Sequence, residues 1–239
     1  MKFQGKELLT LLECIHLKGL IEECLLVIKN ETGTVEAIDM GNSMYVYSTG
    51  PVPGLEDMVV GIPNLGVLCN FLETAAEETI TCTIKDRRFK LRRKSRGSVE
   101  LTLMEKDMVP TSVKQKGSKE KLESNTKYKH HLTKRFCEDF LYYASLIGSK
   151  GVLWQISGGK ISVGSKKEDN QRFFLPAGSV SSKEEFSIEV YTQYLVPIFR
   201  YLIKEIEKEK LSVLRMGSDS PLVITVADNV LWALTPVAI

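Results

Sequence analysis

The chain repeats one order of predicted elements four times, a helix followed by three strands, and this repeat restricts the folds open to it. Apolar residues spaced i, i+3, i+4 and i+7 predict each helix, and alternating apolar and polar residues predict the strands. Only short polar turns separate the strands, so they must pair antiparallel, because parallel pairing needs a long crossover. The repeat therefore predicts an α+β fold with antiparallel sheets and all helices on one side.

Each predicted helix depends on one apolar stripe. Gly148 ends the third helix, and Pro197 is expected in the first turn of the fourth, where proline is tolerated. The stripes are Leu8, Leu11, Leu12 and Ile15; Leu65, Leu68, Cys69 and Leu72; Phe136, Phe140, Tyr143, Ala144 and Ile147; and Leu195, Ile198, Phe199, Leu202 and Ile206. The predicted strands are 24–30, 33–40 and 43–48; 78–85, 87–94 and 98–105; 151–157, 159–165 and 172–177; and 211–217, 221–227 and 230–236.

A polar stretch with no steady period, "DMVPTSVKQKGSKEKLESNTK" at 107–127, divides the sequence almost in half. Such composition is typical of a linker. The sequence therefore predicts two domains of ordinary size, at 1–108 and 128–239, joined by a connector at 109–127.

The charge of the chain is unevenly distributed. The 32 Lys and Arg nearly balance the 30 Asp and Glu, but residues 85–96 hold eight cations against one acid, and residues 114–135 hold eight against two. The rest of the chain carries 16 cations and 27 acids, a balance of −11. A basic surface on an acidic body collects phosphate at one place; two solvated charge runs are the alternative.

Enzymatic, metal and membrane classes find little support. "GKISVGSK" lacks the Gly-Lys pair of a phosphate loop and is better read as a strand turn, and no His lies near a plausible nucleophile, which leaves a hydrolase as a remote alternative. Five cysteines without a Cys-x-x-Cys pair predict buried thiols, and His130, His131 and Cys137 are weak metal candidates. No cofactor is expected.

The longest uncharged run, 58–72, is too short and too rich in Gly, Pro and Asn to span a membrane. The N-terminus lacks the unbroken apolar core of a secretory signal.

The order of units and the last quarter of the chain resemble the DNA sliding clamps of the proliferating cell nuclear antigen and T-even phage type. The resemblance lies in the corner Gly217, Asp219, Pro221 and Leu222, in the ending Leu234 and Pro236, and in the preceding helix "YLVPIFRYLIKEI". "VEAIDMGNSMYVY" is similar to a strand and turn of the first clamp domain. One departure is that the first two helices carry almost no Lys or Arg, where a clamp would want them.

The resemblance implies a ring whose helices line a central hole and contact duplex DNA through phosphates, without reading its sequence. Arg200, Lys204 and Lys208 recur every four residues on the polar side of the fourth helix, although a solvated amphipathic helix would show the same spacing. Further candidates border the third helix or replace the missing cations of the first half. These are Lys134, Arg135 and Lys150, and Lys85, Arg87, Arg88, Lys90, Arg92 and Arg93, with Lys94 and Arg96 beside them.

The resemblance also implies partners. Rings of this family contain six domains, so two domains per chain imply a homotrimer. The resemblance further implies a DNA polymerase and a clamp loader as partners, and a place at replicating DNA inside a cell. The candidate peptide pocket comprises Ile38, Met44, Val109, Pro110, Pro236, Val237 and Ile239; a frayed end is the alternative for the last three. A monomeric or heteromeric clamp-like factor, or a clamp that also acts in transcription, would use the same fold.

Overall fold

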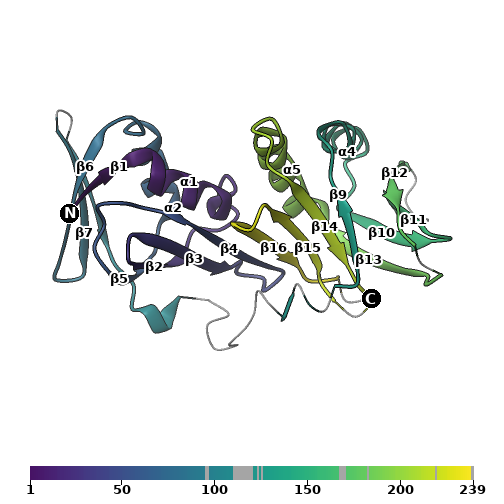
Figure 1. Ribbon diagram of the computed structural model, residues 1–239, viewed down its shortest axis with the longest axis horizontal. Coiled ribbons are helices and arrows are strands. Elements are labelled where there is room, and N and C mark those ends of the chain that lie inside the picture. The colour runs from purple at the N-terminus through teal and green to yellow at the C-terminus, as the bar shows by residue number, and fades with distance from the viewer. Residues whose placement is uncertain are drawn as a thin grey trace. The chain divides into compact units, whose positions relative to one another are not determined.

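The computed structural model describes residues 1–94, 97–109, 121–122, 124, 126–166, 171–181, 183–218 and 220–237. The chain divides into two compact units, Met1–Lys116 and Gly117–Ile239 (Figure 1). Their boundary lies within the segment 109–127 that we expected to connect the domains.

Where it is described, the first unit contains two α-helices and antiparallel strands. The strand orders are β1-β6-β7-β8 and β5-β2-β3-β4. The helices α1 and α2 pack against each other. In chain order its elements are β1 (Lys2–Gln4), α1 (Gly5–His16), β2 (Cys24–Lys29), β3 (Thr32–Ile38), β4 (Met44–Pro51), β5 (Met58–Ile62), α2 (Leu65–Glu73), β6 (Thr79–Lys85), β7 (Arg88–Arg93), β8 (Ser98–Thr102) and the 3-10 turn η1 (Lys106–Met108).

The second unit has the same organisation. Its strand orders are β9-β14-β15-β16 and β13-β10-β11-β12, and α4 and α5 pack side by side (Figure 1). Its elements are β9 (Tyr128–His131), α4 (Lys134–Ile147), β10 (Gly151–Ser157), β11 (Lys160–Gly164), β12 (Phe174–Ser179), β13 (Phe186–Tyr191), α5 (Thr192–Ile206), β14 (Ser212–Met216), β15 (Leu222–Val226) and β16 (Val230–Leu234). The predicted α+β fold and its internal repeat are confirmed.

Each repeat begins with a strand that the sequence analysis missed, so the repeat is strand, helix and three strands. These leading strands are exchanged within each unit: β1 pairs with β6 of the second repeat, and β5 pairs with β2 of the first. In the second unit β9 pairs with β14, and β13 with β10. Neither repeat of a unit therefore completes its sheet alone.

The four leading strands were not predicted for different reasons. β1 and β9 are three and four residues long, too short for a period of two to stand out. β5, "MVVGI", is apolar without alternation. β13, "FSIEVY", alternates clearly, with Ile188 and Val190 buried, and could have been recognised.

The helix ends agree with the sequence signals except at α5. Gly148 caps α4 with φ of 65°, a conformation that glycine adopts without strain. α5 begins at Thr192, so Pro197 is its sixth residue and lies in the second turn. The expectation of a first-turn proline was wrong, because the helix starts directly after the unrecognised β13.

The cores of the two units differ in chemistry. Between α1 and α2 the first unit buries aliphatic residues such as Leu8, Leu12 and Leu68. The second unit buries an aromatic cluster, in which the Phe199 ring lies 4.6 Å from Phe140 and 6.1 Å from Phe136. All five cysteines are buried thiols outside any disulfide. Within the described residues, no helix combines the length and apolar character that crossing a bilayer requires.

Candidate nucleic-acid interface and partner surface

The exposed side of α5 carries two cations. Arg200 and Lys204 are both exposed and four residues apart, which places them about 6 Å apart along one face of the helix. Ile198, Phe199 and Leu202 are buried on the other side. The predicted position of this pair is therefore found, and its contact with DNA stays a prediction.

Lys208 does not continue this row. α5 ends at Ile206, and Lys208 Nζ lies 2.6 Å from Glu205 Oε1, while Lys210 pairs with Oε2 of the same carboxylate. Glu205 is only 2% exposed. Burial alone would raise the pKa of this carboxyl, but the hydrogen bonds from the two lysines outweigh burial and hold the pKa below its ordinary value. Lys208 is therefore paired with Glu205 at the C-terminal end of α5, and we leave it out of the proposed DNA contacts.

Replacing Glu205 with Gln is expected to lower the free energy of unfolding at neutral pH. A carboxyl whose pKa is depressed by folding stabilises the protein above its unfolded pKa, near 4.5, and this contribution is lost as the pH falls through the folded pKa. Denaturant unfolding between about pH 7 and about pH 3 should therefore show the difference between wild type and Glu205→Gln shrinking with acid. The same change at exposed Glu209 is the control. A difference that stays constant with pH would contradict this role.

The cations of α4 are balanced by acids. Lys134 Nζ lies 2.7 Å from Glu207 Oε1 and 3.7 Å from Glu138 Oε1, and Arg135 Nε lies 3.8 Å from Asp139 Oδ2. The hydrogen bond to Glu207 raises the pKa of Lys134. Further along the helix, exposed Tyr142 and Leu146 replace charge with apolar surface. Among the α4 candidates, Arg135 is the more exposed.

The helices of the first unit confirm the departure seen in the sequence. α1 and α2 contain a single lysine, Lys6, whose Nζ lies 3.8 Å from Glu77 Oε1. The same two helices contain three glutamates, Glu7, Glu13 and Glu73. Apart from Lys6, cations of this unit that could contact DNA therefore lie outside its helices.

Four of the eight cations of 85–96 lie on β7. Arg88, Lys90 and Arg92 are exposed and alternate with buried Phe89 and Leu91, so they share the face of the sheet that points away from the core. Exposed Lys85 ends β6. Arg87 lies in the β6–β7 turn, where its Nη1 is 3.1 Å from Glu105 Oε1. Arg96 lies outside the described residues.

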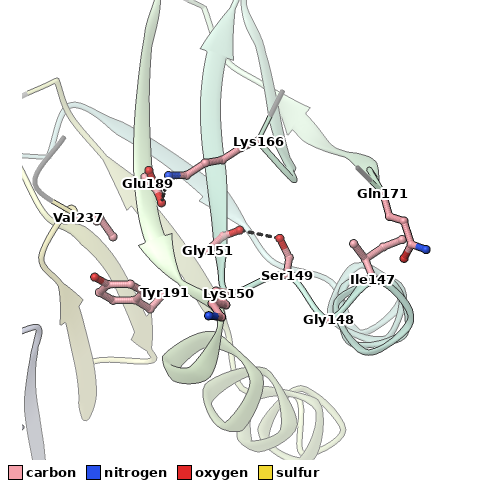
Figure 2. A pocket seen from close by; sticks show the side chains of 10 residues that line it. All are labelled: Ile147, Gly148, Ser149, Lys150, Gly151, Lys166, Gln171, Glu189, Tyr191 and Val237. Carbon is pink, nitrogen blue, oxygen red and sulfur yellow. Dashed lines mark hydrogen bonds and ion pairs between the residues drawn. The ribbon is translucent and has the colours of Figure 1, made fainter. Parts of the chain in front are cut away.

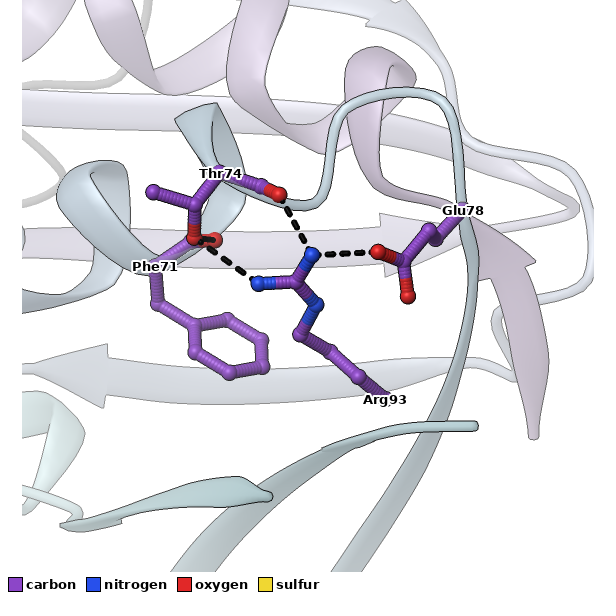
Figure 3. Close-up of polar contacts among 4 residues, drawn as sticks. All are labelled: Phe71, Thr74, Glu78 and Arg93. Carbon is purple, nitrogen blue, oxygen red and sulfur yellow. Dashed lines mark hydrogen bonds and ion pairs between the residues drawn. The ribbon is translucent and has the colours of Figure 1, made fainter. Parts of the chain in front are cut away.

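Arg93 has the opposite parity on β7 and points inward (Figure 3). Its guanidinium donates to the Thr74 carbonyl at 2.6 Å and to Thr74 Oγ1 at 3.1 Å, and it pairs with Glu78. The side chain is 11% exposed, and the hydrogen bond to Glu78 raises its pKa. Arg93 therefore fixes the segment between α2 and β6, and it too leaves the proposed set of DNA contacts.

Two candidate peptide residues of the first unit, Ile38 and Met44, flank a hydrogen-bonded turn between β3 and β4. The buried Asp39 carboxylate accepts hydrogen bonds from the amides of Gly41, Ser43 and Met44 at 3.1, 2.7 and 2.6 Å. Within this turn Met40 is fully exposed. Met40 was not among the predicted residues, although its place in the turn sequence Asp-Met-Gly was a usable signal.

The predicted residues themselves are less accessible. Ile38 is half-buried, Met44 is buried, and Val109 packs on β5, where a Cβ added to Gly61 would lie 2.7 Å from Val109 Cγ2. Met44 and Val109 are therefore buried, Val109 against β5 rather than beside the β3–β4 turn. Pro110 and Ile239 lie outside the described residues.

The second unit contains a pocket of about 690 Å³ at the end of α4 (Figure 2). Within it, Lys166 Nζ lies 2.7 Å from Glu189 Oε1, and the Val237 amide donates to the Glu189 carbonyl at 2.9 Å. Val237 therefore lines a pocket, whereas Pro236 is exposed outside it. The lining residues are Ile147, Gly148, Ser149, Lys150, Gly151, Lys166, Gln171, Glu189, Tyr191 and Val237.

Comparison with known proteins identifies the fold. No family model matches the sequence, and no curated protein matches it. Among solved structures, the DNA polymerase III subunit beta from Pseudomonas aeruginosa matches 99% of this chain with a TM-score of 0.72 and 13% identity. A. fulgidus PCNA, in its complex with the C-terminal region of FEN-1, matches 100% with a TM-score of 0.68 and 14% identity.

The two matches differ in how much of the other protein they cover. This chain spans 65% of the bacterial beta subunit but 98% of the PCNA chain. The two-unit chain is thus about as long as one PCNA subunit. The chain has the fold of the DNA sliding clamps over its full length.

Proposed function

We propose that this chain, with its sliding-clamp fold, is a DNA polymerase processivity factor that closes as a homotrimer around duplex DNA. The full-length match to two clamps, at only 13% and 14% identity, is the observation that carries this proposal. In this role the chain is a scaffold for a polymerase and other proteins at replicating DNA inside a cell, and it catalyses no reaction itself.

Two sheet edges suit assembly with further copies. β8 ends the order β1-β6-β7-β8, and β12 ends the order β13-β10-β11-β12. Exposed strand edges favour pairing with other chains. Phe174 on β12 is 69% exposed, so this edge also presents a large apolar side chain that an interface could bury. Pairing of β8 with β12 of the next copy would repeat around a closed ring. Six units in such a ring correspond to three chains.

The proposed contact with the encircled duplex depends on α4 and α5. Arg200, Lys204 and Arg135 are exposed cations on these helices, and contacts to phosphates alone carry no sequence information. Such contacts permit sliding, as a processivity factor requires. Lys134 contributes less because Glu207 and Glu138 hold it, and Lys150 lies at the pocket.

The proposed partner surface is the β3–β4 turn of the first unit with exposed Met40, and the segment at Pro236 and Val237 in the second unit is a separate candidate. Asp39 fixes the turn, so a partner peptide need not order it, and methionine adapts to several apolar partners. The clamp loader that would open the ring and the polymerase are expected to use this surface.

Topological retention on DNA tests the function directly and needs no loader. The protein is allowed to thread onto a linear duplex, the duplex is circularised by ligation, and the complex is washed at high salt. We expect the protein to stay on the circle and to leave after a single restriction cut, because salt weakens phosphate contacts but not linkage. An Arg200→Gln/Lys204→Gln variant should remain linked while losing about 0.9 of salt slope per missing contact.

Two results would reject the proposal. One is loss of the protein from the closed circle at the same rate as from cut DNA. The other is a native mass of one chain at micromolar concentration and low salt, which would favour a monomeric factor with this fold.

A further inference from the structure

We infer that the outer face of the sheet β1-β6-β7-β8 binds the phosphate backbone of a nucleic acid, separately from any duplex contacted by the helices. The register of the strands places five cations on this one face. Lys2 lies opposite Thr81 and Thr81 opposite Arg92, Thr83 lies opposite Lys90, and Lys85 lies opposite Arg88. Directly paired residues of antiparallel strands point to the same side of the sheet.

The face is strongly positive. It carries Lys2, Lys85, Arg88, Lys90 and Arg92 against one acid, Glu100 on β8, a balance of five minus one, or +4. Glu100 Oε1 lies 2.6 Å from Arg88 Nη1, and its Oε2 lies 3.8 Å from Lys90 Nζ. Within the described part of the chain, Lys2, Lys85 and Arg92 have no ion pair. Exposed pairs contribute little to stability, so folding does not account for this set.

The opposite side of the same sheet faces the core. Phe3, Ile80, Phe89 and Leu91 are buried there, and a Cβ on Gly5, the first residue of α1, would lie 3.0 Å from Ile80 Cδ1. The helices of this unit therefore lie on the side from which the five cations point away. A duplex held against the helices cannot also contact these cations from the same unit.

The chemistry of the face favours a phosphate backbone over an acidic protein segment. Hydroxyl side chains stand between the cations at Thr79, Thr81, Thr83, Ser98 and Thr102, and hydroxyls, Lys and Arg are the usual donors to phosphate. The cations at alternate residues of β7 are spaced by about 7 Å. They therefore form a flat row along the strand. The face presents none of the aromatic anchors that dominate protein interfaces.

Binding of the purified protein to a linear duplex of about 30 base pairs, which cannot stay topologically linked, tests this inference. We compare Arg88→Gln/Lys90→Gln/Arg92→Gln with Lys29→Gln/Lys106→Gln/Lys160→Gln, which removes the same charge from three exposed lysines elsewhere. If three phosphate contacts are lost, the wild-type affinity should fall about forty-fold more than that of the β7 variant between roughly 50 and 200 mM salt. The control variant should behave as wild type. Equal unfolding curves for the two variants exclude a folding defect.

A β7 variant whose salt slope equals that of the control would overturn the inference. So would displacement of the DNA by a polyglutamate peptide at lower concentration than by unlabelled DNA of equal charge, which would assign the face to an acidic protein segment. The inference stands apart from the proposed ring. Loss of topological retention by the wild type would reject the ring and leave the slope difference intact. If the ring closes, the β7 variant should be retained as well as the wild type, whether or not the sheet face binds nucleic acid.

Discussion

Replacing Phe199 with Ala is expected to destabilise the second unit by about 3 to 5 kcal/mol, the usual loss when a buried aromatic side chain is truncated. Phe199 is fully buried on α5. Its ring contacts the Phe140 ring edge to face, with centroids 4.6 Å apart and planes at 71°, and contacts Phe136 at 6.1 Å. Because Phe136 and Phe140 belong to α4, the loss separates the two helices that join the repeats of this unit.

Tryptophan fluorescence during denaturant unfolding measures this effect. Both tryptophans, Trp154 and Trp232, belong to the second unit, and the Trp154 ring lies 5.9 Å from Phe136, so the signal follows the affected core. Tyr142→Ala on α4 is the matched control, since that ring is exposed and its loss should cost about 0.5 kcal/mol or less. A loss below about 1 kcal/mol for Phe199→Ala would contradict the proposal that Phe199 holds α5 against α4.

Replacing Phe174 with Lys is expected to open the proposed ring. An aromatic side chain that acts as the hot spot of an interface contributes about 2 kcal/mol or more, and its exchange for a charge adds a desolvation cost. Dissociation of each interface should therefore become at least about thirty-fold easier. The variant should remain folded, because Phe174 is mostly exposed within the chain.

Native mass measured over a concentration series, together with retention on circular DNA, tests this change. Val59→Lys makes the same substitution at an exposed apolar residue of β5, and this control should assemble like the wild type. If Phe174→Lys forms trimers at the same concentration as the control, then β12 does not form the interface.

The sequence predicted most of the fold because its helices and central strands follow strict periods. Phe136, Phe140 and Ala144 were enough to locate α4, and Gly148 located its end. Leading strands were missed where a segment such as Lys2–Gln4 is too short to show a period. The exchange of these strands between repeats depends on pairing across the whole unit, and no local pattern contains that information.

The candidate site was only partly predictable. Alternation along β7 assigns Arg93 to the side of buried Phe89 and Leu91, so its inward direction could have been predicted from parity. The end of α5 had no glycine to mark it, and the commitment of Lys208 to Glu205 depends on how deeply that carboxylate is buried. Spacing in the sequence specified which cations share a helix face, but not which of them an acid already holds.

The exchanged leading strands limit when each unit can fold during synthesis at the ribosome. Lys2–Gln4 emerges well before its partner Thr79–Thr81, which follows only after more than half of the first unit has been made. Tyr128–His131 likewise waits for residues near Met216. Until then each nascent unit displays unpaired strands and apolar helix faces, the state in which chains aggregate or recruit chaperones. Each unit should therefore fold slowly and all at once, after its last repeat has been translated.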